Sequence, residues 1–137
     1  MEITFWIISW IISSIIYILL GLVWYRIFEK TWLEEINKTK EEVKFTIGDY
    51  IGTVVTALII ILVEGYVINL FYYALGYMNI GFGIMVGAII WIGFVAAVGL
   101  VQFLYKNRSM TLFLIDYGYH LIGLLIGGLI FGIFYSI

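Results

Sequence analysis

The stretch MTLFLIDYGYHLIGLLIGGLIFG, residues 110–132, decides the fold of this chain. It belongs to an apolar run over about 110–135, longer than the roughly 20 residues that a helix needs to cross a bilayer. Three other runs have the same character, at about 3–25, 50–72 and 82–104. None of them alternates in polarity, so they predict helices rather than membrane strands. We therefore expect an all-α integral membrane four-helix bundle with four transmembrane helices.

The composition predicts one transmembrane domain over residues 1–137. Hydrophobic residues make up 64% of the chain and charged residues 12%, and a soluble domain has no use for so much apolar surface. The chain has no cysteine, which excludes disulfides, thiolate catalysis and thiolate-bound metals. The few charges mix both signs, so we expect the lipid bilayer rather than nucleic acid as a partner.

The seven basic residues predict the orientation of the bundle. Five of them follow the first apolar run and two follow the third, whereas residues 73–80, between the second and third runs, carry no charge. In a four-pass protein the two charged connections lie on the same side of the membrane. The positive-inside rule makes that side cytoplasmic. We therefore expect both termini on the outer side.

The end of the first run predicts an interfacial anchor. Trp24 and Tyr25 are placed as an aromatic belt, Arg26 follows them toward the lipid head groups, and Trp32 lies one to two turns further on. Beyond this anchor, apolar residues recur near helical spacing within the polar segment 29–47. We interpret that segment as a short amphipathic connector helix on the cytoplasmic surface.

Pairs of glycines four residues apart predict close contacts between helices, because small residues let helix backbones approach each other. The helix-packing candidates are Gly83, Gly87, Gly123, Gly127, Gly128 and Gly132. Packing within one copy of the chain explains such pairs. The last run also offers two pairs on adjacent faces, enough for an internal and an external partner. A homo-oligomer is therefore a second interpretation.

Three ionisable residues fall inside the apolar runs, namely Glu64, Asp116 and His120. Such residues are costly in a membrane and point to function. Asp116 and His120 are four residues apart and share a helix face. Counting depth from the charged side at 1.5 Å per residue, Glu64 lies about 20 Å deep and His120 about 15 Å deep. The three side chains could therefore form one buried cluster.

Three interpretations of this cluster remain open. It could be structural, with carboxyl groups bonding across helices. It could carry protons or small cations, because chains of carboxylates and histidine form proton relays. It could also bind a metal ion, although the chain has no diagnostic metal-binding spacing, and we predict no metal site and no cofactor. The sequence contains no Ser-His-Asp order and no glycine-rich phosphate loop, so we expect no enzyme and no catalytic residue.

Two stretches carry a resemblance to a known family. The first is GLVWYRIFEKTW, residues 21–32, and the second extends from Gly87 to Gly132 and includes WIGF, residues 91–94, and NRSMTLFLIDYGYH, residues 107–120. The spacing of aromatic residues and glycines in them resembles that of the domain of unknown function 1761 family of small four-helix membrane proteins. The resemblance implies a four-helix fold in a prokaryotic cytoplasmic membrane.

The resemblance supplies no activity, and one residue departs from its pattern. Where the family usually has Asn, this chain has Asp116, which implies a hydrogen-bonding role at that position. Two functions are therefore predicted from the residues alone. The first is an oligomeric channel or transporter for protons or small cations. The alternative is a non-catalytic structural or accessory subunit of a larger membrane assembly.

Overall fold

The computed structural model describes residues 2–137. Its elements are α1 (Ile3–Glu35), α2 (Ile47–Leu75), α3 (Ile80–Ile90), the π-helical segment η1 (Trp91–Ala96), α4 (Ala97–Tyr105) and α5 (Met110–Ser136). Because α3, η1 and α4 follow one another without a break, four helical spans are long and apolar enough to cross a membrane. The all-α, four-helix fold class is confirmed, and no strand occurs within the described residues.

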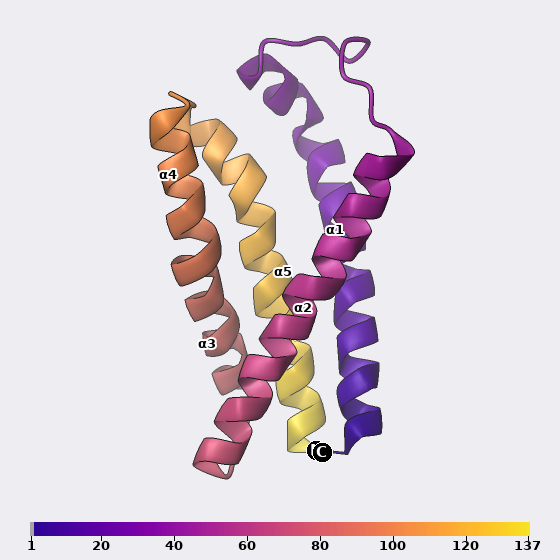
Figure 1. Cartoon of the computed structure of the whole chain (residues 1–137), viewed down its shortest axis with the longest axis vertical. Helices are drawn as coiled ribbons and strands as arrows, with labels where there is room; N and C mark the ends of the chain where they lie inside the picture. The colour runs from indigo at the N-terminus through magenta and orange to yellow at the C-terminus, as the bar shows by residue number, and fades with distance from the viewer. Residues whose placement is uncertain (1) are drawn as a thin grey trace.

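Helix α5 is the centre of the bundle. It packs against α1, α2 and the α3–η1–α4 span, whereas α1 has no contact with that span within residues 2–137. Both termini and the α2–α3 connection lie at one end of the bundle, and both charged connections lie at the other (Figure 1). The end with the charged connections is called the basic end below. Successive spans therefore run in opposite directions between the two ends, as four membrane crossings require.

The buried core is small and lies around α5. Its fully buried side chains include Ile61, Ile68, Leu124 and Phe131. Most other large apolar residues face outward, and the exposed ones extend along all the spans. Lipid tails are as apolar as leucine, so an outward apolar surface costs nothing in a bilayer. The fold therefore depends on close packing and polar ties rather than on a large core.

Helix α1 is longer than the sequence predicted. It ends at Glu35, ten residues beyond the predicted end at 25, and it takes up the first part of the segment 29–47. The remainder forms turns rather than a helix, and Asn37 there has a positive φ of 54°. The prediction of a separate amphipathic connector helix is wrong. Trp32 explains the extension, because its side chain is bonded to α5 and holds the last turns of α1 against the bundle.

Helix α2 begins at residue 47 rather than 50 because a capping box starts it. The Thr46 hydroxyl accepts a hydrogen bond from the backbone N–H of Asp49, and the Asp49 carboxylate accepts one from the backbone N–H of Thr46 at 2.6 Å. This reciprocal pair satisfies two backbone donors at the helix start. At the other end Gly76, with φ 76°, closes the helix in the left-handed conformation that glycine adopts freely.

Every tryptophan ties two helices together. The chain has five, and four of them donate their indole N–H to a backbone carbonyl of another helix. These bonds are Trp6 to Gly65, Trp10 to Leu58, Trp24 to Ile115 and Trp91 to Tyr117. The fifth tryptophan donates to a carboxylate, described below. In lipid a polar tie of this kind helps to fix the register of neighbouring helices.

Candidate functional site

The glycines of α3 and α5 form the closest helix contact in the molecule. A Cβ atom added at Gly83 would collide with the backbone carbonyl of Gly128, and one added at Gly132 would meet the backbone of Ile80 at 2.6 Å. Gly123 faces the ring of Tyr17 at 2.5 Å on the same measure. All six predicted packing glycines are therefore used within one copy. A homo-oligomer that uses one of these glycine pairs stays a prediction.

Glu64 of α2 occupies a notch between α3 and α5. A Cβ added at Gly87 would come within 2.8 Å of its Oε1, and one at Gly127 would collide with its Oε2. The side chain has an exposed fraction of 0%, and neither oxygen has a hydrogen-bond partner within residues 2–137. The backbone of Gly128 lies near the carboxyl, but without the geometry of a hydrogen bond. The two glycines make room for a carboxyl group that forms no hydrogen bond with residues 2–137.

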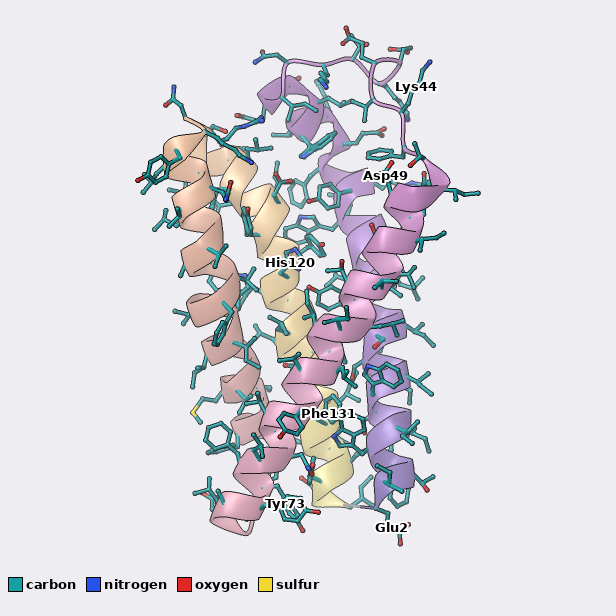
Figure 2. All side chains as sticks on the ribbon, viewed as in Figure 1. Glu2, Lys44, Asp49, Tyr73, His120 and Phe131 are labelled. Atoms are coloured by element: carbon teal, nitrogen blue, oxygen red, sulfur yellow. The ribbon has the colours of Figure 1, made fainter. Side chains whose placement is uncertain are left out.

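His120 of α5 pairs with Tyr17 of α1. The Tyr17 hydroxyl and the His120 Nδ1 are hydrogen-bonded, and the donor depends on which ring nitrogen carries the proton. His120 also stacks against Tyr119, with ring centroids 3.9 Å apart. Figure 2 shows His120 within the half of the bundle nearer the charged connections, with Phe131 nearer the termini. Sequence reasoning did not identify Tyr17, since nothing in a run of apolar and aromatic residues distinguishes it.

Asp116 of α5 holds the extended end of α1. Its Oδ1 accepts hydrogen bonds from the Tyr25 hydroxyl at 2.9 Å and from the Trp32 indole N–H at 3.0 Å. The Trp24 N–H bonds Ile115 one residue earlier. The polar atoms of the predicted interfacial tryptophans and tyrosine are therefore used inside the bundle, whereas Arg26 is exposed.

The three predicted ionisable residues lie along one face of α5 rather than in one cluster. Along α5, His120 follows Asp116 after four residues. Gly127, where the Glu64 carboxyl lies, follows His120 after seven. Seven residues correspond to about 10 Å along a helix, so the Glu64 carboxyl cannot contact His120. The sequence predicted a smaller difference in depth between Glu64 and His120. Helix α2 starts three residues earlier than expected, which adds about 4.5 Å to the depth of Glu64. Within residues 2–137 no three acidic or histidine side chains converge on a metal ion.

Buried serines of α1 accompany the Glu64 notch. Ser9, Ser13 and Ser14 are almost fully buried, and the hydroxyls of Ser13 and Ser14 have no hydrogen-bond partner within residues 2–137. Tyr17 of α1 faces Gly123 of α5. Because α1 and α5 are antiparallel, one turn before Tyr17 on α1 is at the same level as one turn after Gly123 on α5. Ser13 and Gly127 occupy these two positions. The Ser13 hydroxyl therefore lies at the level of the Glu64 carboxyl.

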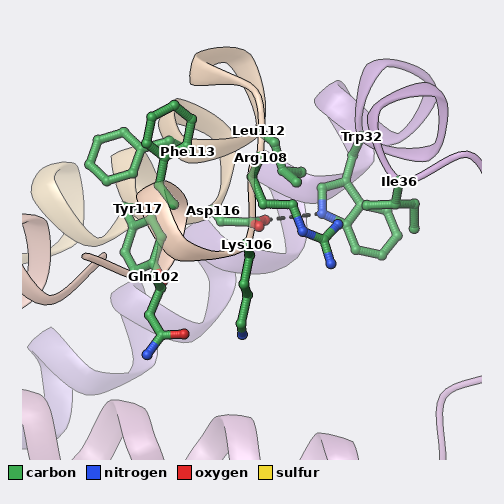
Figure 3. Close-up of a pocket in the computed structure, with 10 residues that line it drawn as sticks. Trp32, Ile36, Gln102, Lys106, Arg108, Leu112, Phe113, Asp116 and Tyr117 are labelled. Atoms are coloured by element: carbon green, nitrogen blue, oxygen red, sulfur yellow. Dashed lines mark hydrogen bonds between the residues drawn. The ribbon is translucent and has the colours of Figure 1, made fainter. Parts of the chain in front are cut away.

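A pocket opens at the basic end, between α1, α4 and α5. Its volume is about 240 Å³, and Figure 3 shows Trp32, Gln102, Lys106, Arg108 and Asp116 around it. Aromatic and aliphatic side chains from α4 and α5 complete its walls. The pocket reaches Asp116 and Tyr117, but Glu64 and His120 do not line it. The polar groups along α5, namely Asp116, His120 and the Glu64 carboxyl, thus extend from a solvent-accessible pocket to a buried site.

Comparison with known proteins places the chain in a family. No curated protein and no solved structure matches it. One family model, described as Protein of unknown function (DUF1761), matches residues 8–132, which is nearly the whole chain. The match includes the segments that carry Tyr17, Glu64, Asp116 and His120. The chain therefore belongs to the DUF1761 family.

Proposed function

We propose that this protein moves protons across a prokaryotic cytoplasmic membrane, with Glu64 as the carboxyl that binds the proton. The observation that carries the proposal is a side chain with an exposed fraction of 0% whose two oxygens have no partner within residues 2–137. Burying a polar group without a hydrogen bond costs several kcal/mol. A carboxyl that served only as a tie between helices would make interhelical bonds, and Glu64 makes none. Binding and releasing a proton gives this group a use.

A proton suits the Glu64 notch better than a larger cation does. Metal cations that prefer oxygen ligands, such as Ca²⁺ and Mg²⁺, take about six or more of them. The notch offers one carboxyl and the backbone carbonyl of Leu124, and the Ser13 hydroxyl at the same level does not raise the number of oxygens to six. A proton needs only the carboxyl itself. We therefore assign the transported species as a proton.

The Tyr17–His120 pair supports a route to Glu64 from the basic end. It lies between the pocket at Asp116 and the notch at Gly127. A hydroxyl and an imidazole can each donate and accept a hydrogen bond, so the pair can pass a proton in either direction. Along α5, Asp116 lies about 6 Å from His120, and the Glu64 notch at Gly127 lies about 10 Å from it. Each step is longer than a hydrogen bond, so transfer requires a water molecule or a side-chain rotation.

Toward the termini the route is closed in a single copy. Phe131 and Ile68 are fully buried beyond Glu64, and the ring of Phe131 lies against Gly65. A complete crossing requires these side chains to move or a second copy to supply the missing half. Of these two possibilities we propose the second, so that the transporting unit is a homo-oligomer. We also propose that it contains no catalytic residue. Light scattering of the purified protein in detergent tests for the oligomer, and a monomeric mass would contradict it.

Proton flux into liposomes tests the proposed function. Purified wild type, Glu64→Gln and the control Glu41→Gln are reconstituted side by side, and thermal stability is recorded on the same samples. Glu41 is an exposed glutamate in the connection after α1, so its substitution controls for loss of an acidic residue. We expect flux in wild type and in Glu41→Gln, and its loss in Glu64→Gln with stability kept. Flux that survives Glu64→Gln would contradict the proposal.

The same experiment identifies the alternative function. An accessory subunit would show no flux in any sample, and its Glu64→Gln variant would lose stability if the carboxyl served packing. In that case the exposed apolar surface of α3 and η1, which includes Ile89, Ile92 and Phe94, would be the first surface to search for a partner protein.

A further inference from the structure

We propose that the pocket at the basic end binds the head group of an anionic phospholipid. This inference rests on the pocket and its charges, and it is independent of the proposed role of Glu64. Lys106 and Arg108 line the pocket, and neither forms an ion pair within residues 2–137. The ion pairs in that part of the chain are Lys30 with Glu34 and Lys40 with Glu29. Two basic side chains thus share one pocket without an acidic partner in ion-pair contact.

The negative charge in the pocket is already engaged. Asp116 lines the same pocket, and its Oδ1 accepts two hydrogen bonds from α1. Figure 3 shows Arg108 and Lys106 beside Asp116, and neither forms an ion pair with it within residues 2–137. Among the side chains that line the pocket, two are basic and one is acidic. Glu35 does not line it, and its carboxylate is hydrogen-bonded to the Ser109 hydroxyl. A phosphate oxyanion can accept charge-assisted hydrogen bonds from both basic groups, and arginine binds phosphate through two parallel N–H groups.

The position of the pocket favours a lipid over free phosphate. Lys106 follows directly on the apolar span that ends at Tyr105, and Arg108 lies two residues before the next span begins. Basic groups at this level meet the head groups of the bilayer. Basic pockets between transmembrane helices on the cytoplasmic side are sites of anionic head groups in other membrane proteins.

The walls of the pocket match the rest of such a molecule. Apolar side chains from three parts of the chain, Ile36, Phe103 and Phe113, line it beside the basic groups. A volume of about 240 Å³ holds a phosphate with its glycerol portion but not two acyl chains. The chains would leave between the helices into the bilayer. Inorganic phosphate has no apolar part and would use only the basic groups.

Native mass spectrometry and thermal unfolding of the delipidated full chain in detergent test the inference. The probes are phosphatidylglycerol, phosphatidylcholine and inorganic phosphate, each added at the same concentration. The pocket variant is Lys106→Gln with Arg108→Gln. The matched control is Lys38→Gln with Lys44→Gln, which removes two charges at the same end but outside this pocket. Asp116→Asn removes the negative charge from the pocket, so its effect on lipid binding should be opposite to that of the pocket variant.

We expect wild type and the control to retain phosphatidylglycerol and to be stabilised by it more than by phosphatidylcholine. The pocket variant should bind it about ten-fold more weakly or worse, since charge-assisted hydrogen bonds are lost. Asp116→Asn should bind it at least as tightly as wild type. Equal effects of the two lipids, an equal loss in the control, or full stabilisation by inorganic phosphate alone would overturn the proposal.

Discussion

A single buried carboxyl fits into this bundle because two neighbouring residues have no side chain. Gly87 and Gly127 leave the space that the Glu64 oxygens fill, on α3 and α5 respectively. Larger residues at either position would push the carboxyl out or force the helices apart. The same glycines also bring α3 and α5 together, so the packing of the helices and the burial of Glu64 have one cause.

Gly127→Ala should therefore destabilise the protein by about 1–3 kcal/mol, the usual cost of overpacking a tight site. The new methyl group would collide with Glu64 Oε2 and lie 3.1 Å from Ile61 Cδ1. Adding Glu64→Ala should restore part of the loss, because it removes the collision. Thermal or denaturant unfolding measures both. Gly93→Ala is the control, since a Cβ there meets nothing within 4 Å. A loss for Gly93→Ala as large as that for Gly127→Ala would show that the notch is not the cause.

Asp116→Asn should leave stability within about 0.5 kcal/mol of wild type, whereas Asp116→Leu should cost about 2 kcal/mol or more. Both hydrogen bonds to this residue end on Oδ1, and an amide oxygen accepts them equally well. Proton flux should also survive Asp116→Asn, because Asp116 anchors α1 and does not carry the proton. Loss of flux in this variant would move the proton route onto Asp116.

Much of the residue-level site could be read from the sequence, within limits set by geometry. The spacing of Asp116 and His120 fixed their common face, and the apolar context identified Glu64 as buried. The spacing could not show that Tyr25 and Trp32 reach Asp116 or that Tyr17 reaches His120. Those contacts join α1 to α5 across more than 80 positions, and one sequence carries no information on such pairs.

At the scale of elements, polar contacts rather than hydropathy set the helix ends. Hydropathy placed the four spans correctly because their cores are continuous apolar runs. It placed the end of α1 too early, since residues beyond the bilayer can stay helical when α5 holds them. It also gave no sign of the π-helical segment η1 (Trp91–Ala96), where Trp91 bonds the carbonyl of Tyr117. π-Bulges in helices frequently occur at functional sites.

Thr46→Ala should shift the start of α2 toward its interior and cost about 1 kcal/mol of stability. The substitution removes the hydroxyl that caps the backbone N–H of Asp49. Thr39→Ala is the control, because Thr39 lies in the turns after α1 and caps no helix. Thermal unfolding compares the two, and hydrogen exchange at residues 47–50 locates the change. Unchanged exchange in Thr46→Ala would contradict the assignment of the capping box.

At the scale of the whole molecule, the two ends of the bundle differ in charge. All basic residues lie in the last three turns of α1 or in the two connections at the same end, and both termini lie at the other end. By the positive-inside rule we expect the basic end, with its pocket, to face the cytoplasm. A tag at the C-terminus should then be accessible only from outside intact cells, and a cysteine introduced at position 41 only from inside. A C-terminal tag that is labelled from the cytoplasm would contradict this orientation.

The row of polar groups along α5 gives the two ends different access to Glu64. The pocket, Asp116 and the Tyr17–His120 pair all lie between the basic end and the carboxyl, whereas Phe131 closes the other direction. We therefore expect Glu64 to take up a proton from the basic end only in the state described. A proton taken up at the basic end would reach the other end only after a change of state or through a second copy.

Difference infrared spectroscopy of the protein in liposomes tests most directly whether Glu64 binds an exchangeable proton. The pH on each side is changed in turn, and the carboxyl band of wild type is compared with that of Glu64→Gln. We expect a buried carboxyl band that disappears in Glu64→Gln and that responds to pH at the basic end. In Tyr17→Phe this response should be slower. A Glu64 band that does not respond to pH on either side would contradict this expectation.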